Sequence, residues 1–274
     1  MLKALGAPPA RSWILVAALL FPLASGAVEA APTLVLGAED EAAPWSYADG
    51  QGYVNDLVRL AFKSQGWLLR LDIMPYARCK QMALSGMLAG CFTTSREPEL
   101  ADKLLFPSRP VISPHHILVV RSNSSLAGCQ SERWGRAPTV AIVNGYEYAE
   151  GLEALLKSSR LLANKVKSES VALRMLALNR TDVAAVTLDD VKQLEFLLED
   201  SALKPAQFKV LCDYGSIPGF VAFSAAHPMG REALIVFEHG FAAITKSGEI
   251  ARLQQRWRDL APTLPRSAAS GGTK

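Results

Sequence analysis

The spacing of apolar residues predicts alternating strands and helices in the first part of the chain. The strands are short β-rich or alternating runs, and the helices repeat apolar residues at intervals of three and four. A proline at the first position and a glycine just past the last mark the second helix. In order, the expected elements are a strand at 33–37, a helix at 53–65, a strand at 67–73, a helix at 75–85 and a short strand that runs into a polar turn at Arg96. This order is typical of a mainly parallel sheet.

A polar, turn-rich stretch at 122–138 separates this part from a second alternation of the same kind. The order strand, turn, helix, strand, helix, strand recurs, although no residue-level repeat accompanies it. Its elements are expected at 139–145, 146–159, 165–169, 170–178 and 183–187, with a helix from 189 onward. Further strands at 209–212 and 219–224 and a helical stretch at 231–260, broken at 247–248, complete the pattern. We therefore expect an α/β protein with two lobes.

Residues 1–30 have the pattern of an export signal. Lys3 and Arg11 precede an apolar run at 13–23, and small residues follow at Val28 and Ala30. The run is shorter than the roughly 20 residues that a membrane span needs. We expect this segment to be a cleaved signal peptide, with an uncleaved anchor as the alternative.

Charge and histidine spacing narrow the function classes. The formal net charge of +3 is spread along the chain, which gives no support to nucleic-acid binding. The histidines have no metal-ligand spacing, and the adjacent pair His115 and His116 is expected at the surface. No nucleophile motif with a suitable context is present. We therefore expect no cofactor and no metal.

The four cysteines are Cys79, Cys91, Cys129 and Cys212. In an exported protein, pairing is more common than catalysis, and no CxxC motif suggests redox chemistry or zinc. Three pairings are possible from the sequence alone. We favour Cys79 with Cys91, because a helix followed by a strand that folds back would bring them level, and this leaves Cys129 for Cys212.

Several short motifs occur in an order that resembles one family. They are PWSY, YVNDLVRLAF, PYARCKQMALSG, TTSRE, FPSRP, VAIVNGYEY, ALNRTDVAAVTLDD and KSGEIARLQQRW, and they extend over nearly all of the chain after residue 30. Together they resemble the periplasmic solute-binding proteins of the polar amino-acid uptake type, extracellular solute-binding family 3, in an uncharacterised PWxR-like subgroup. The resemblance implies a type II periplasmic-binding-protein fold whose two α/β lobes, joined by a two-strand hinge, close over a small solute.

The resemblance also implies a division of the chain. The expected parts are a signal peptide at 1–30, the first part of lobe one at 31–121, lobe two at 122–215, a return to lobe one with C-terminal helices at 216–264, and a disordered tail at 265–274. The hinge is expected near Arg121 and at 212–219. The implied partners are a small solute and the membrane permease of an ABC transporter or a receptor, with the protein itself a monomer in the periplasm.

The resemblance supplies a set of candidate ligand-binding residues. Arg96 and Thr93 match the family's TxxR element, in which the arginine binds a carboxylate through paired hydrogen bonds. Trp45 stands where an aromatic residue covers the solute. Glu39 stands where an acid holds the amine, whereas Thr187 replaces the usual second aspartate.

Further candidates follow from position. Asp189 lies two residues after Thr187 and could supply the missing charge. Tyr47 follows Trp45, Tyr76 and Arg78 belong to the PYAR motif, and Tyr146 opens the second lobe. The alternative for Trp45 and Tyr47 is packing under their loop, and for Tyr76 it is the role of an aromatic helix cap. The alternative for Arg78 and Arg96 is a solvated surface position.

Three functions are compatible with this pattern. The first is binding of a small carboxylate-bearing solute, an amino acid or a related compound, for delivery to an ABC transporter. The second is an enzyme on the same fold, similar to the cyclohexadienyl dehydratases, with Glu39 as general acid or base. The third is a sensor module that presents the solute to a membrane receptor. We favour the non-enzymatic binding protein.

Overall fold

The computed structural model describes residues 32–263. The predicted signal peptide and the predicted disordered tail lie outside the described residues. In the described part of the chain, no helix combines the length and the apolar character needed to cross a membrane. The strands form two five-stranded sheets, together with a small hairpin of β2 (Glu41–Ala42) and β3 (Ser46–Tyr47).

The first sheet has the order β4-β1-β5-β12-β6. Its strands are β1 (Thr33–Glu39), β4 (Leu68–Met74), β5 (Gly90–Thr94), β6 (Leu104–Leu105) and β12 (Phe220–Ser224). Strands β4, β1 and β5 are parallel, whereas β12 is antiparallel to β5 and to β6. The sheet is therefore mixed rather than mainly parallel, because β12 returns from the second sheet and enters in the opposite direction.

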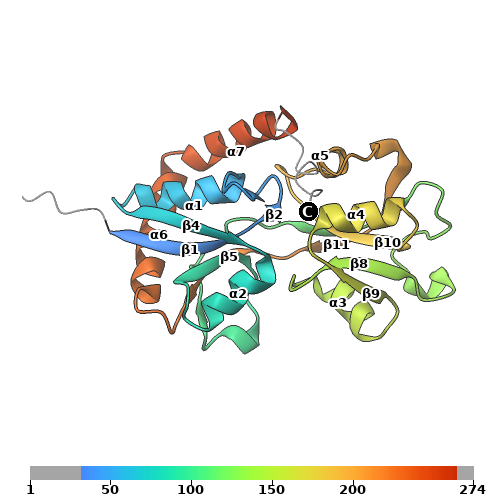
Figure 1. Cartoon of the computed structure of the whole chain (residues 1–274), viewed down its shortest axis with the longest axis horizontal. Helices are drawn as coiled ribbons and strands as arrows, with labels where there is room; N and C mark the ends of the chain where they lie inside the picture. The colour runs from blue at the N-terminus through green and yellow to red at the C-terminus, as the bar shows by residue number, and fades with distance from the viewer. Residues whose placement is uncertain (1–31, 264–274) are drawn as a thin grey trace, which may run out of the picture. The chain divides into compact units, whose positions relative to one another are not determined.

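Helices cover both faces of this sheet (Figure 1). They are α1 (Tyr53–Lys63), α2 (Tyr76–Leu84), α6 (Gly230–Lys246) and α7 (Glu249–Leu260). Alternate residues of β1, Leu34, Leu36 and Ala38, are buried in a core shared with α1, α6 and α7. Cys91 and Ala222 instead share a cluster with α2. The period-two pattern of the strands thus divides their side chains between the two helical layers.

The second sheet has the order β11-β7-β10-β8-β9. Its strands are β7 (His115–Arg121), β8 (Thr139–Val143), β9 (Leu162–Val166), β10 (Val183–Leu188) and β11 (Phe208–Ser216), and its helices are α3 (Glu150–Lys157), α4 (Glu169–Ala177) and α5 (Leu194–Asp200). In Figure 1, α3 and α4 lie on opposite faces of β8 and β10. Leu118 and Val120 of β7 pack in the α3 core, and Ile117 and Val119 pack in the α4 core.

The strand at the predicted end of lobe one belongs to the second sheet. Strand β7 is antiparallel to β10 and to β11, so the chain first crosses between the sheets at 106–114 and not near Arg121. It crosses back at 217–219, where an isolated antiparallel bridge joins Ile112 to Gly219. The two crossing segments therefore lie side by side, in the arrangement of a two-strand hinge.

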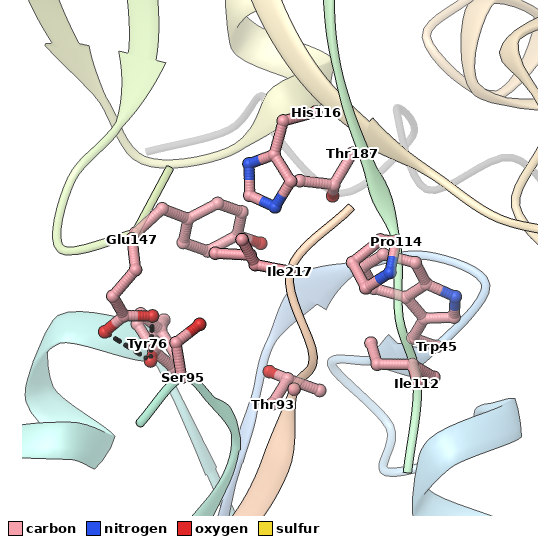
Figure 2. Close-up of a pocket in the computed structure, with 12 residues that line it drawn as sticks. Trp45, Tyr76, Thr93, Ser95, Ile112, Pro114, His116, Glu147, Thr187 and Ile217 are labelled. Atoms are coloured by element: carbon pink, nitrogen blue, oxygen red, sulfur yellow. Dashed lines mark hydrogen bonds between the residues drawn. The ribbon is translucent and has the colours of Figure 1, made fainter. Parts of the chain in front are cut away.

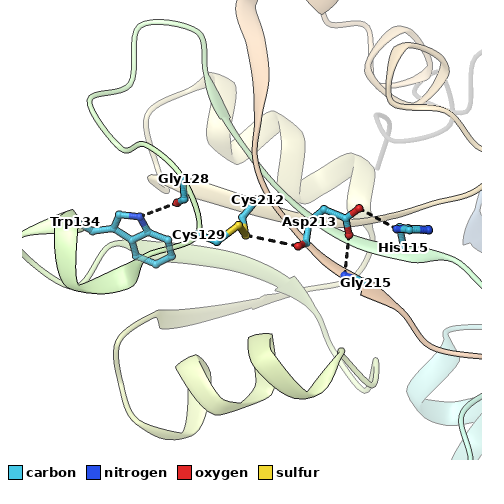
Figure 3. Close-up of a disulfide and its surroundings, with 7 residues drawn as sticks. All are labelled: His115, Gly128, Cys129, Trp134, Cys212, Asp213 and Gly215. Atoms are coloured by element: carbon cyan, nitrogen blue, oxygen red, sulfur yellow. Dashed lines mark hydrogen bonds and ion pairs between the residues drawn. A yellow bond between two sulfur atoms is a disulfide. The ribbon is translucent and has the colours of Figure 1, made fainter.

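Both favoured cysteine pairs are present as disulfides. Cys79 of α2 joins Cys91 of β5, with 5.7 Å between the Cα atoms. Cys129 joins Cys212 of β11, with 5.0 Å between the Cα atoms, and Figure 3 shows this disulfide beside Asp213. Each disulfide lies within one lobe, so neither prevents the lobes from moving relative to one another.

Candidate functional site

A small cavity of about 40 Å³ lies where the two sheets meet. Side chains of both lobes and of the crossing segments line it, as Figure 2 shows. They are Trp45, Tyr76, Thr93, Ser95, Ile112, Pro114, His116, Tyr146, Glu147, Thr187, Ile217 and Gly219. The cavity is lined by hydroxyl, imidazole and aromatic groups and holds little more than a water-sized guest in this closed arrangement.

The wall from lobe one is held in place by backbone hydrogen bonds. The N–H groups in the first turn of α1 have no acceptor within the helix. Those of Tyr53 and Val54 donate instead to the carbonyls of Pro44 and Trp45, at 2.9 and 3.0 Å. This fixes the loop that carries the buried Trp45 ring. Thr93 at the end of β5 has a φ of 68°, a strained conformation for a threonine and one that is found more often at functional sites.

The wall from lobe two contains a buried ion pair. The Lys192 side chain is completely buried and its ammonium group donates to the Glu169 carboxylate. Glu169, at the start of α4, also accepts from the backbone N–H and the hydroxyl of Thr187 at 2.6 and 2.7 Å. The Lys192 ammonium lies 4.0 Å from the centre of the Trp45 ring across the interface, a cation–π contact.

Three hydrogen-bonded contacts connect the lobes around the cavity. Tyr146 donates to Glu39 at 2.8 Å. The Trp45 indole N–H donates to Asp189 at 3.0 Å. Glu147 accepts from the Tyr76 hydroxyl, 2.9 Å from each carboxylate oxygen, and from the Lys80 ammonium. These contacts hold the lobes in a closed arrangement.

The loop at 144–149 brings Tyr146 and Glu147 to the interface. The sequence predicts a helix from 146, but α3 begins at Glu150. Gly145 has a φ of 88°, and a Cβ at this position would lie 2.9 Å from the Cβ of Ala77 in α2. Only glycine fits this close approach, and the next two side chains of the loop reach lobe one.

Burial changes the acid–base properties of the site. Desolvation raises the pKa of Glu39 from 4.5 to about 8, against the smaller lowering effect of the Tyr146 hydrogen bond. Glu39 is therefore largely protonated at neutral pH. Desolvation also raises the pKa of Glu147 and of Asp189, while their hydrogen-bond donors oppose the shift.

His116 is a site residue that the sequence analysis missed. His115 is exposed and lies 2.9 Å from the Asp213 carboxylate, as expected for a surface histidine, but His116 is only 2% exposed. Within the described part of the chain, neither ring nitrogen of His116 has a hydrogen-bond partner. Burial and the nearby Lys192 ammonium lower its pKa to about 4, so the ring is neutral. Strand alternation along β7 does not by itself reveal that this histidine faces a cavity.

Arg96 lies at a second, larger cleft of about 880 Å³. Its guanidinium donates to the Pro107 carbonyl and lies 4.2 Å from the centre of the Phe220 ring. Ser95, Tyr146 and other residues line both the small cavity and this cleft. The exposed Arg96 side chain is thus at the rim of the interface.

The predicted site residues fall into four groups. Those that line the small cavity are Trp45, Tyr76, Thr93, Tyr146 and Thr187. Glu39 and Asp189 lie behind this lining as hydrogen-bond partners of Tyr146 and Trp45, and Arg96 lies at the larger cleft. Tyr47 and Arg78 line neither. The Tyr47 ring stacks on Trp257 within lobe one, and Arg78 is exposed on α2.

Metal binding has no support in this region. Among residues 32–263, the structure contains no group of three or more histidine, cysteine, aspartate or glutamate side chains that could hold a metal ion. The acids of the interface are instead engaged by tyrosine, tryptophan and lysine side chains.

No family model matches the chain, and no curated protein matches it. Solved structures with a similar fold include an ancestral arginine-binding protein bound to arginine, with a TM-score of 0.69 and 17% identity over 83% of this chain and 99% of that one. A histidine kinase sensor domain with similarity to periplasmic binding proteins has a TM-score of 0.68 and 19% identity over 83% and 96%. The ancestral amino acid-binding protein AncCDT-1, a precursor of cyclohexadienyl dehydratase, has a TM-score of 0.64 and 16% identity over 82% and 94%. The chain has the two-lobe periplasmic-binding-protein fold.

Proposed function

We propose that the protein binds a small carboxylate-bearing solute, an amino acid or a related compound, between its lobes in the periplasm and delivers it to an ABC transporter. The observation that carries the proposal is the polar cavity at the junction of the two sheets, which two adjacent segments join in the described part of the chain. Ligand sites occur preferentially at such junctions between lobes.

Arg96 is the proposed partner of the solute carboxylate. The cleft beside it, about 880 Å³, is within the size range of small-molecule sites. The guanidinium makes a cation–π contact with the Phe220 ring, and one of its nitrogens donates a hydrogen bond to the Pro107 carbonyl. The remaining N–H groups could form the paired hydrogen bonds that a carboxylate accepts.

Binding would be coupled to a hinge motion at the two crossing segments. The contacts of Trp45 with Asp189 and of Tyr146 with Glu39 form only when the lobes are closed, because their partners belong to different lobes. A solute that adds contacts to both walls would shift the population toward the closed form.

The test is the effect of Arg96→Ala on ligand binding. Native mass spectrometry of freshly purified protein would first weigh any solute that remains bound. We expect Arg96→Ala to abolish binding of the carboxylate ligand in isothermal titration while the circular dichroism spectrum stays unchanged. Arg78→Ala is the matched control, because Arg78 is an exposed arginine that lines neither cavity. Equal affinity of Arg96→Ala and the wild type would remove Arg96 from the site.

A sensor role is the second candidate, because one similar structure is a sensor domain. Neighbouring genes for a permease and an ATPase would support transport, and a receptor kinase gene would support sensing. An enzyme role receives less support, since Glu39 is hydrogen-bonded to Tyr146 and does not line the cavity. Incubation with prephenate-like and amino-acid pools, followed by mass spectrometry, would detect turnover.

A further inference from the structure

Lys192 occupies a site built for an ammonium ion. Its ammonium group has a carboxylate partner in Glu169, a hydroxyl in Thr187 at 3.3 Å and an aromatic face in Trp45 at 4.0 Å. Carboxylate, hydroxyl and aromatic face are the groups that recognise a primary amine on a ligand. Here the chain's own lysine takes that place, and the side chain is completely buried.

The other acids of the interface are also engaged. One oxygen of Asp189 accepts from the Trp45 indole, and the other accepts two backbone N–H groups at 2.9 and 2.8 Å. The Glu147 carboxylate accepts hydrogen bonds from the Tyr76 hydroxyl and the Lys80 ammonium. Glu39 accepts from Tyr146, and its raised pKa of about 8 leaves it mostly uncharged. The acids next to the small cavity are therefore all engaged by donors of the chain itself, whereas Glu97, Glu150 and Glu153 line only the larger cleft.

The groups that remain for a ligand suit an uncharged oxygen substituent. His116 lines the cavity with both nitrogens unpartnered among the described residues, next to Thr187 (Figure 2). A neutral imidazole offers one N–H donor and one lone pair. A hydroxyl group can use both, and a carbonyl oxygen can use the donor. The nearby Lys192 ammonium opposes a second positive charge in this position.

We infer that the solute is a carboxylate without an amine, of the 2-hydroxy or 2-oxo acid class, because the Lys192 ammonium already takes the carboxylate, hydroxyl and aromatic face that would recognise an α-amino group. This inference rests on the proposed function. His116 would contact the oxygen substituent, and Arg96 would contact the carboxylate at the rim.

The experiment compares acids that share a carbon skeleton and differ only in the substituent at C2. The sets are lactate, pyruvate and alanine; 2-hydroxyglutarate, 2-oxoglutarate and glutamate; and phenyllactate, phenylpyruvate and phenylalanine. Isothermal titration of the full chain should give at least a tenfold tighter Kd for the hydroxy or oxo member than for the amino member of the best-fitting set. Equal or tighter binding of the amino member would overturn the inference and leave the proposed function standing. Binding of no member of any set would overturn the proposed function itself.

A lysine substitution gives a second readout. Lys192→Ala removes the ammonium group and most of the side-chain volume, which leaves space beside the Glu169 carboxylate, so the affinity for the amino member should rise at least tenfold relative to the wild type. Lys246→Ala, a substitution of an exposed lysine in the last turn of α6, should leave the selectivity unchanged. Unchanged selectivity in a folded Lys192→Ala protein would contradict the inference. If this variant does not fold, the wild-type comparison still decides.

Discussion

The buried Glu39 predicts a specific dependence of stability on pH. Its side chain is 4% exposed, and desolvation raises its pKa from 4.5 to about 8 in the folded protein. A group whose pKa is higher in the folded state than in the unfolded state binds more protons when the protein is folded. Its stabilising contribution to the free energy of unfolding is fully present below the unfolded pKa and is lost as the pH rises through the folded pKa. Glu39 should therefore destabilise the fold progressively between pH 4.5 and 8.

His116 acts in the opposite direction over part of this range. Burial lowers the pKa of His116 from 6.5 to about 4. Its stabilising contribution to the free energy of unfolding is therefore present above pH 6.5 and is lost as the pH falls toward 4. The two effects oppose each other below pH 6.5. From pH 6.5 to 8 the contribution of Glu39 should lower the free energy of unfolding by about 2 kcal/mol. For a chain of this size, that corresponds to a fall of about 4–8 °C in Tm.

The assay is thermal unfolding followed by circular dichroism at pH 6.5 and pH 8.0 and constant ionic strength. In Glu39→Gln the titrating group is absent, so the fall between the two pH values should be smaller than in the wild type by the Glu39 contribution, because every other group contributes equally to both proteins. Glu195→Gln, an exposed glutamate in α5, is the control and should behave as the wild type does. The same fall in Tm for the wild type and for Glu39→Gln would refute the reasoning.

Two further predictions concern the first disulfide and the contact between the lobes. The Cys79–Cys91 disulfide closes a short loop with a sequence separation of 12. Replacing both cysteines by alanine should therefore lower the free energy of unfolding, measured in urea, by about 3 kcal/mol. An unchanged urea midpoint would contradict this prediction. Tyr76→Phe removes a hydroxyl that donates to the Glu147 carboxylate across the interface, a hydrogen bond of about 1.5–3 kcal/mol. The open form should therefore be more populated in the ligand-free variant than in the wild type, with a larger average radius of gyration in small-angle X-ray scattering, and an identical scattering curve would show that the hydrogen bond does not stabilise the closed form.

Local sequence patterns determined the elements and the fold class. The helices expected at 53–65 and 75–85 are present as α1 and α2, and the break at 247–248 separates α6 from α7. These features depend on periodicity, proline and glycine, whose effects act over a few residues. Local order also favoured the pair Cys79 and Cys91, because a helix followed by a strand that folds back would bring them level, although three pairings were open from the sequence alone.

The tertiary structure decided which sheet each strand joins. Strand β7 has the same apolar pattern in either lobe, so its sequence could not show that it pairs with β10 and β11. Its register against β10 sets His116 beside Thr187 at the cavity, whereas the adjacent His115 remains exposed. Pairing between strands far apart in the sequence depends on the whole sheet.

The burial of charge was decided in the same way. Lys192 follows two aspartates and has the sequence context of a surface lysine, yet it is completely buried against Glu169 of α4 and the Trp45 ring of the other lobe. The sequence around Lys192 does not show that Glu169 and Trp45, which are 23 and 147 residues away along the chain, contact its ammonium group in the folded protein. The chemistry of the interface therefore depends on how the two lobes meet, because desolvation and pairing of charges arise only when the distant elements are assembled.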